Sequence, residues 1–210
     1  MLLEAKKIEL LDGRGLDKTE EISDNKLAEI VRDGDSERYG EIIDRYQGKL
    51  FAYLYRLIGN REEAQDLLQD VFIKVYRNLR SYDAERKFSS WIYRIAHNEA
   101  VNHIKRKSLK RFVSWESVVS TKDKLESSSN EEGAQDAWIR KEISQEVNAA
   151  IDRLPAKYKQ VLLLRYYSDN SYEEISEILD RPVNTVGTLI NRAKRKLAEE
   201  LKNLKKEVLK

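Results

Sequence analysis

The twenty residues from Phe88 to Lys107, FSSWIYRIAHNEAVNHIKRK, carry apolar side chains at a regular spacing of four. This apolar row consists of Ile92, Ala96, Ala100 and Ile104. A spacing of four places side chains on one face of an α-helix, whereas a half-buried strand needs apolar residues at every second position. The stretch therefore predicts an amphipathic helix whose apolar row packs against a protein core.

A second row of side chains runs along the same stretch, beside the apolar one. It consists of Trp91, Arg94, Asn98, Asn102 and Lys105, and we assign the neighbouring Tyr93 and Arg106 to the same surface. Aromatic rings stack on bases, amides read base edges, and cations meet phosphates. The row therefore predicts a nucleic-acid-binding surface. The alternatives are that Trp91 and Tyr93 belong to the core, as most aromatic residues do, and that Lys105 and Arg106 are solvated charges.

The scarcity of helix-breaking residues predicts an all-α protein of two small helical domains. The 210 residues include two prolines and eight glycines, and long segments keep a period of 3.6. Residues 112–138 lack this period and contain SSSNEEG, which is typical of a flexible linker. We expect a partly disordered leader at 1–22, an N-terminal helical bundle at 23–111, the linker at 112–138 and a C-terminal domain at 139–210. Such a linker would permit a compact arrangement in which the domains occlude each other.

Local capping signals predict where the helices of both domains begin. Asp35 and Ser89 each precede a helical pattern and are expected to act as N-caps. Asn60 with Glu63 resembles a capping box for a helix that continues to about Leu79. The same pattern recurs at Ser171, where Glu174 follows three residues later, and predicts the start of a short helix.

Charge is distributed unevenly, although the net charge is only +2. Residues 86–111 contain eight lysines and arginines against one acid, and residues 181–206 contain eight against two. Between them, residues 114–138 contain six acids against two lysines. Two basic segments separated by an acidic one predict two contacts with one polyanion.

The C-terminal domain contains the pattern of a helix-turn-helix. The short helix after Ser171 is followed by a turn at residues 180–182 and a longer basic helix from Val183. In this motif the second helix enters the major groove by its N-terminal half. The side chains expected to face DNA are Asn184, Thr185, Thr188, Asn191, Arg192 and Arg195. An ordinary pair of packed helices is the alternative.

Several classes of function find no support in the sequence. The chain has no cysteine, and His97 and His103 are six residues apart without a metal-binding pattern, so we expect no metal, no cofactor and no catalytic residue. It contains no glycine-rich phosphate loop, and no apolar run approaches the roughly 18 residues of a membrane span. We expect a soluble, cytoplasmic protein that is not an enzyme and does not insert into a membrane.

In combination, three motifs resemble the sigma-70 family of bacterial transcription initiation factors, in the short form of its extracytoplasmic-function (ECF) subfamily. The motifs are AQDLLQDVFIKVYRNL, FSSWIYRIAHNEAVNHIKR and LPAKYKQVLLLRYYSDNSYEEISEILDRPVNTV, and the resemblance covers about residues 28–201. It implies a monomer that binds core RNA polymerase and directs promoter-specific initiation. The N-terminal domain would recognise and open the minus-ten element with the loop 81–87 and the helix after it, and the helix-turn-helix would recognise the minus-thirty-five element in duplex DNA.

The first motif matches the family's polymerase-binding segment. The resemblance assigns polymerase contacts to Asp66, Gln69, Asp70, Phe72 and Lys74, whereas the charged row taken alone is more typical of a solvated helix face. The family also implies an anti-sigma protein as a partner.

Two residues of the second helix of the helix-turn-helix depart from the family pattern. Gly187 and Leu189 stand where basic or polar DNA contacts are usual, which predicts weak or unusual recognition of the minus-thirty-five element.

The alternative function is a self-standing helix-turn-helix regulator that binds duplex DNA without polymerase. A paired-helix adaptor protein is less favoured because it needs no basic row such as that of residues 88–107.

Overall fold

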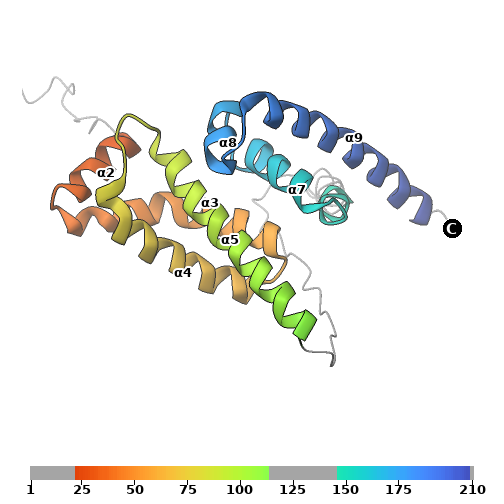
Figure 1. The fold of residues 1–210 in the computed structure, drawn as a ribbon, viewed down its shortest axis with the longest axis horizontal. Helices are drawn as coiled ribbons and strands as arrows, with labels where there is room; N and C mark the ends of the chain where they lie inside the picture. The colour runs from red at the N-terminus through yellow and green to blue at the C-terminus, as the bar shows by residue number, and fades with distance from the viewer. Residues whose placement is uncertain (1–21, 114–145, 209–210) are drawn as a thin grey trace, which may run out of the picture.

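The computed structural model describes residues 22–113 and 146–208, and all the regular structure within these ranges is helical (Figure 1). The fold is therefore all-α, as the sequence predicts. The leader expected at 1–22 and the linker expected at 112–138 lie almost entirely outside the described residues.

The N-terminal domain is a bundle of four α-helices joined by short turns. Its elements are α2 (Asp24–Arg32), the 3₁₀ turn η1 (Ser36–Arg38), α3 (Tyr39–Ile58), α4 (Arg61–Asn78), the 3₁₀ turn η2 (Leu79–Ser81) and α5 (Phe88–Val113). The largest side chains of its core are fully buried, among them Tyr53, Leu54, Phe88 and Ile92. Burying such side chains is the main source of stability for the bundle.

The C-terminal domain contains the helix-turn-helix that the sequence predicts. Residues 146–152 are helical and are followed by α7 (Ala156–Leu162), the π-helical turn η3 (Leu163–Tyr167), α8 (Tyr172–Leu179) and α9 (Val183–Val208). Both hydrogen bonds of the capping box at Ser171 and Glu174 are present, which confirms that prediction. Asp180 adopts a left-handed backbone conformation with φ 51° and thereby ends α8 before the turn.

Of the predicted caps, those at Asp35 and Ser89 are wrong and the box at Asn60 is only partly right. Asp35 makes no side-chain capping bond. Asn60 accepts the amide of Glu63 at 2.9 Å, but the Glu63 carboxylate turns to His103 and Lys107 on α5 and does not complete the box. Ser89 lies inside α5 and not before it.

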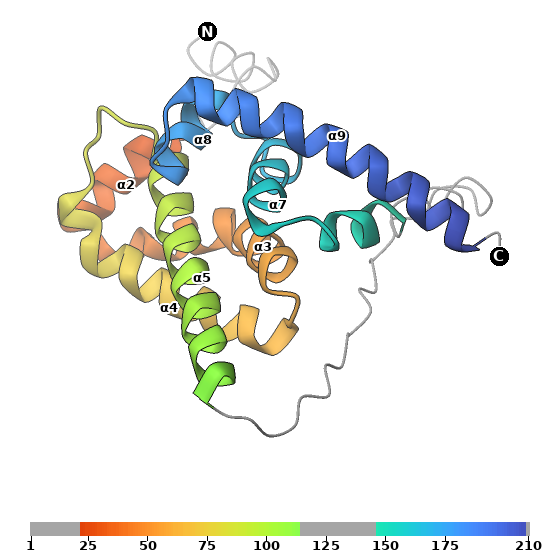
Figure 2. The ribbon, with the colours of Figure 1, turned by 45° about the vertical axis from the view of Figure 1, so that its right-hand side comes forward.

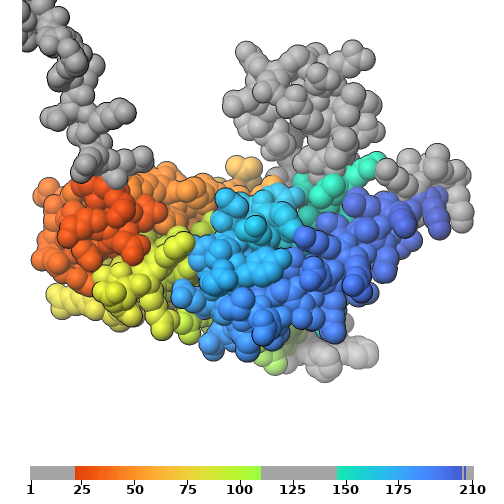
Figure 3. All heavy atoms as spheres, turned by 90° about the horizontal axis from the view of Figure 1, so that it is seen from above, coloured from red at the N-terminus to blue at the C-terminus, as the bar shows by residue number. Residues whose placement is uncertain are grey.

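The two domains pack directly against each other. Helix α5 runs beside α8, and α3 contacts both η3 and α7 (Figure 2). One continuous cluster of buried residues extends from the N-terminal bundle into the C-terminal domain. Figure 3 shows the C-terminal domain packed against the N-terminal domain, where α8 contacts α5. The surface that the sequence assigns to nucleic acid therefore adjoins the helix-turn-helix.

Candidate nucleic-acid interface

The predicted row on α5 lies largely on the surface of the N-terminal domain. Its exposed members are Arg94, Asn98, Asn102, Lys105 and Arg106, whereas Trp91 is half-buried. The adjacent apolar row is buried at Ile92, Ala96 and Ala100, but Ile104 is 37% exposed because the helix extends beyond the bundle there. The structure thus presents amides and cations along one exposed helix face.

Tyr93 does not belong to this exposed face. Its side chain is 3% exposed and packs edge-on against Tyr53, with ring centroids 5.7 Å apart. Burial raises the pKa of Tyr93, and its side-chain hydrogen bond with Ser168 of the C-terminal domain acts in the opposite direction. In this arrangement the ring of Tyr93 belongs to the core, because the interface between the domains encloses it, and its contact with DNA stays a prediction.

Trp91 belongs to an aromatic cluster that supports the loop before α5. Its ring centroid lies 5.3 Å from that of Tyr82 and 5.7 Å from that of Phe88, and Phe88 in turn packs edge-on against Tyr46. Tyr82 and Phe88 are buried. Trp91 therefore combines a buried side that holds the loop with an exposed side on which a base can stack.

A charged groove separates this part of α5 from the turn of the helix-turn-helix. It is lined by Arg86, Arg94, Ser176, Glu177, Asp180, Arg181 and Pro182. Three arginines and two carboxylates line this groove, so it brings charges of both signs together between the two domains. In this arrangement Arg94 lines a groove together with residues of the C-terminal domain.

His97 lies buried on α5, and the sequence predicts no functional role for it. Its Nδ1 lies 2.8 Å from the hydroxyl of Tyr53. Burial, together with the positive charge of Arg181, lowers the pKa of His97 to about 4. His97 is therefore neutral near pH 7, and its protonation would oppose the packing of both domains.

A second hollow lies between α4 and the far half of α5. It is lined by Lys74, Glu99, Asn102, Lys105, Arg106 and Leu109. Lys74 forms an ion pair with the mostly buried Glu99 at 2.5 Å. Lys74, which the family resemblance assigned to polymerase, therefore has a partner on α5 and shares this hollow with three members of the predicted nucleic-acid row.

The side chains predicted to read duplex DNA lie on the outer face of α9. Asn184, Thr188, Asn191, Arg192 and Arg195 are exposed, and Thr185 is half-buried. The hydroxyl of Thr188 donates to the backbone carbonyl of Asn184 at 2.9 Å. Five of these six side chains are thus accessible to a ligand in the major groove.

The two departures from the family pattern on α9 do not lie on this face. Leu189 packs against the core of its own domain. A Cβ atom at Gly187 would lie 3.6 Å from the ring of Tyr172, so this position faces α8. The prediction that Gly187 and Leu189 replace DNA contacts is therefore not supported by their positions.

The row on α4 that the family resemblance assigns to polymerase is exposed except at one residue. Asp66, Gln69 and Asp70 face outward, but Phe72 is only 8% exposed, so in this arrangement it offers little surface to a partner. Two apolar neighbours for which we predicted no role, Ile73 and Tyr76, are 48% and 49% exposed. The sequence already indicates that these two side chains are exposed, because both lie off the apolar row of α4 that forms the core.

None of the helices in residues 22–113 and 146–208 combines the length and the apolar character needed to cross a membrane.

Family models match both domains of the chain. Sigma-70 region 2 matches residues 42–110, and Sigma-70 region 4 matches residues 144–197. The first match contains α4, the loop before α5 and most of α5, and the second contains the helix-turn-helix.

Two solved structures share the fold. CnrH in complex with the cytosolic domain of CnrY covers 86% of this chain and 97% of its own, with a TM-score of 0.62 and 22% identity. The sigma factor RpoE in complex with the anti-sigma factor NepR from Bartonella quintana covers 78% and 96%, with a TM-score of 0.66 and 20% identity.

The matches with two curated relatives extend over nearly the whole length of each relative. The ECF RNA polymerase sigma factor SigW of Bacillus subtilis is 36% identical over 181 residues, which cover 85% of this chain and 97% of SigW. The ECF RNA polymerase sigma-E factor of Escherichia coli K12 is 30% identical over 194 residues, covering 89% and 98%. With both domains matched in this order, the chain belongs to the ECF sigma factors of the sigma-70 family.

Proposed function

We propose a division of labour between the two domains of this RNA polymerase sigma factor. The N-terminal domain binds core RNA polymerase through α4 and contacts the minus-ten element through α5 and the loop before it. The C-terminal domain contacts the minus-thirty-five element through α9. As a sigma factor, the protein initiates transcription without an enzymatic activity of its own, and it acts in the cytoplasm with polymerase.

The observation that carries this proposal is the exposed face of α5. Arg94, Asn98, Asn102 and Lys105 follow one another along it, and the half-buried Trp91 lies at its beginning. Strand separation costs a few kcal/mol for each unstacked base step. Stacking on Trp91, hydrogen bonds to the two amides and neutralisation of phosphates by the cations would offset that cost.

The recognition helix supports a contact with duplex DNA. Asn191 and Arg195 are exposed one turn apart, and amide and guanidinium groups make bidentate hydrogen bonds with adenine and guanine. Lys194 and Lys196, also exposed, are suited to phosphates, which position the helix without specifying sequence. Recognition of the minus-thirty-five element would thus use the outer face of α9.

The packed arrangement of the domains is suited to a state without DNA. Helix α8 contacts α5, and the groove between them includes Arg94. Contact of α5 with promoter DNA along its whole length would require α8 to move away. We therefore propose that in the free protein the two domains occlude each other.

We also propose an anti-sigma protein as a partner. The RpoE fold described above is in complex with the anti-sigma factor NepR, and CnrH is in complex with the cytosolic domain of CnrY. Exposed apolar side chains on both domains, such as Ile73 and Tyr166, support protein partners of this kind.

Run-off transcription with purified core polymerase tests the proposal. Fragmented genomic DNA is transcribed with and without the protein, and the upstream sequences of new transcripts are compared. We expect discrete transcripts whose promoters share two motifs. Asn98→Ala and Asn102→Ala should reduce them, whereas Gln47→Ala, an exposed substitution on α3, should not.

The same assay separates this proposal from the self-standing regulator. That alternative requires sequence-specific binding of duplex DNA by the protein alone. Specific duplex binding without polymerase, combined with no new transcripts, would refute the division of labour proposed here.

A further inference from the structure

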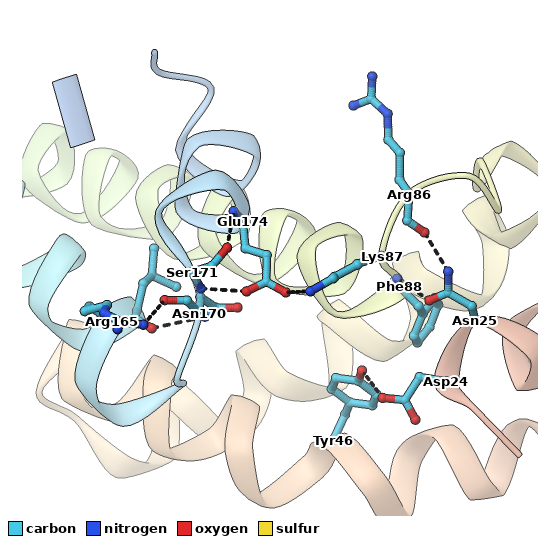
Figure 4. Close-up of polar contacts among 11 residues, drawn as sticks. Asp24, Asn25, Tyr46, Arg86, Lys87, Phe88, Arg165, Asn170, Ser171 and Glu174 are labelled. Carbon is cyan, nitrogen blue, oxygen red and sulfur yellow. Dashed lines mark hydrogen bonds and ion pairs between the residues drawn. The ribbon is translucent and has the colours of Figure 1, made fainter. Parts of the chain in front are cut away.

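The loop between η2 and α5 is held by one side chain from the beginning of the chain. The Nδ2 group of Asn25, on α2, donates to the backbone carbonyl of Arg86 at 2.9 Å and to that of Ala84 at 3.3 Å. Its Oδ1 atom accepts the backbone amide of Phe88 at 2.9 Å. Figure 4 shows Asn25 beside Arg86 and Phe88. A residue about sixty positions away thus provides the cap that Ser89 was expected to supply.

The aromatic support beneath the loop adds further restraints. The hydroxyl of Tyr82 donates to the carbonyl of Arg86 at 2.6 Å, so this carbonyl accepts two hydrogen bonds. The backbone amide of Arg86 donates to the carbonyl of Asp83 at 3.0 Å and closes a turn. The backbone from Asp83 to Phe88 is therefore fixed, while the side chains of Arg86 and Lys87 remain exposed.

Asn25 makes full use of its amide in this position. The group offers two N–H donors and one carbonyl acceptor, and each of these has a partner in the loop or at the start of α5. Asn25 is the second residue of α2, whose N-cap is Ser23, and the three hydrogen bonds of its side chain go to the loop and to Phe88.

We infer that Asn25 is the positioning residue of the loop that holds single-stranded minus-ten DNA. The inference rests on the proposed function, in which this loop and α5 bind the separated strand. A loop that is already ordered binds its ligand without a further cost in conformational entropy. Asn25 fixes the backbone that carries Arg86 and Lys87 and the first turn that carries Trp91, so that the cations and the ring keep their relative positions.

Three variants separate positioning from general stability. Asn25→Ala removes all three hydrogen bonds. Asn25→Asp keeps an acceptor for the Phe88 amide but loses both donors and places a carboxylate near two carbonyl oxygens. Ser23→Ala is the control, because Ser23 caps α2 through the amide of Lys26 and does not contact the loop.

The experiment uses holoenzyme assembled from core polymerase and each full-length variant. Two fluorescent probes come from one promoter recovered by run-off transcription: the single non-template strand of its minus-ten segment, and a duplex of its minus-thirty-five segment. We expect Asn25→Ala to weaken binding of the single strand by about tenfold. Asn25→Asp should weaken it by the same factor or by a smaller one. Binding of the duplex should stay unchanged in both variants. Ser23→Ala should bind both probes as the unaltered protein does.

Two results would overturn the inference alone. One is binding of the single strand by Asn25→Ala at the unaltered affinity. The other is an equal loss of binding to both probes, shared by Ser23→Ala, which would indicate a purely structural role. Failure of the unaltered holoenzyme to bind the single strand would instead refute the proposed function, and the inference with it.

Discussion

The ammonium group of Lys87 lies 3.0 Å from Oε1 of Glu174 and thereby connects the loop before α5 to α8 (Figure 4). The other carboxylate oxygen of Glu174 accepts the backbone amide of Ser171 at 2.6 Å. Burial acts to raise the pKa of Glu174, but the hydrogen bond from Ser171 and the neighbouring Lys87 outweigh it, so this pKa lies below its ordinary value. One side chain therefore caps α8 and joins the two domains.

Replacing Glu174 with glutamine should loosen the contact between the domains. Glutamine serves equally well in a capping box, so α8 keeps its start while the charge opposite Lys87 is lost. Lys87 is 69% exposed, and ion pairs of this kind contribute about 0.2–1 kcal/mol, so the population of separated domains should rise by no more than about fivefold. Energy transfer between dyes on cysteines introduced at Asp44 and Lys202 measures this population, because the chain has no native cysteine.

Glu173→Gln is the control for this measurement. Glu173 is exposed on the same helix and carries the same charge, but no ion pair connects it with the N-terminal domain among the described residues. Equal energy transfer in Glu174→Gln and Glu173→Gln would show that the Lys87–Glu174 pair does not hold the domains together.

Acidification should destabilise the protein through His97. The folded state lowers the pKa of His97 to about 4 from an ordinary value of 6.5, so folding favours the neutral imidazole. The stabilisation is fully present above pH 6.5 and is lost as the pH falls toward 4, because the unfolded chain takes up the proton first. Between pH 7 and 5 the loss should be roughly 2 kcal/mol.

Urea denaturation of His97→Gln at pH 7 and pH 5 checks this expectation. Glutamine can accept or donate a hydrogen bond with the hydroxyl of Tyr53 but does not titrate in this range. Its free energy of unfolding should change less between the two pH values than that of the unaltered protein. Keeping the pH at 5 or above limits the contribution of Glu63 and Glu174, whose pKa values are lowered from 4.5. Equal changes in both proteins would refute the assignment.

The helices could be predicted from the sequence because their signals are local. The apolar row of α5 contains Ile92, Ala96 and Ala100, which are buried, and the box at Ser171 and Glu174 forms as expected. These features depend on spacings of three or four residues, which the sequence displays directly. The same holds for the exposed amides and cations on α5 and α9.

The sequence could not place residues whose surroundings are set by distant segments. Tyr93 is enclosed by the C-terminal domain, and Glu63 turns from its predicted box to α5. Asn25 and Phe88 lie 63 residues apart in the sequence and are joined by a hydrogen bond. No local pattern distinguishes such residues from neighbours that face solvent. The helix period indicates roughly on which side of its helix a residue lies, but it does not indicate which other segment packs against that side.

Gly187→Ala should stabilise the protein without weakening its contact with duplex DNA. Glycine in a helix interior costs roughly 0.5–1 kcal/mol relative to alanine, and the added methyl group would make an ordinary contact with Tyr172 at 3.6 Å. The free energy of unfolding in urea should rise by up to that amount, while the affinity of the holoenzyme for a minus-thirty-five duplex stays constant. A loss of affinity would show that the backbone at Gly187 approaches DNA closely.

Ile73→Asp should weaken binding to core RNA polymerase with little effect on folding. Ile73 is 48% exposed on α4 beside Asp66, Gln69 and Asp70, so an aspartate there remains solvated in the free protein. In a complex, the carboxylate would be removed from water against an apolar partner surface, and affinity should fall by about tenfold or more. Titration of labelled protein with core polymerase measures the dissociation constant, and thermal unfolding verifies the fold. Gln47→Asp places the same group on an exposed position of α3 and should leave both quantities unchanged. If both variants bind polymerase equally well, the contact surface does not include the exposed face of α4.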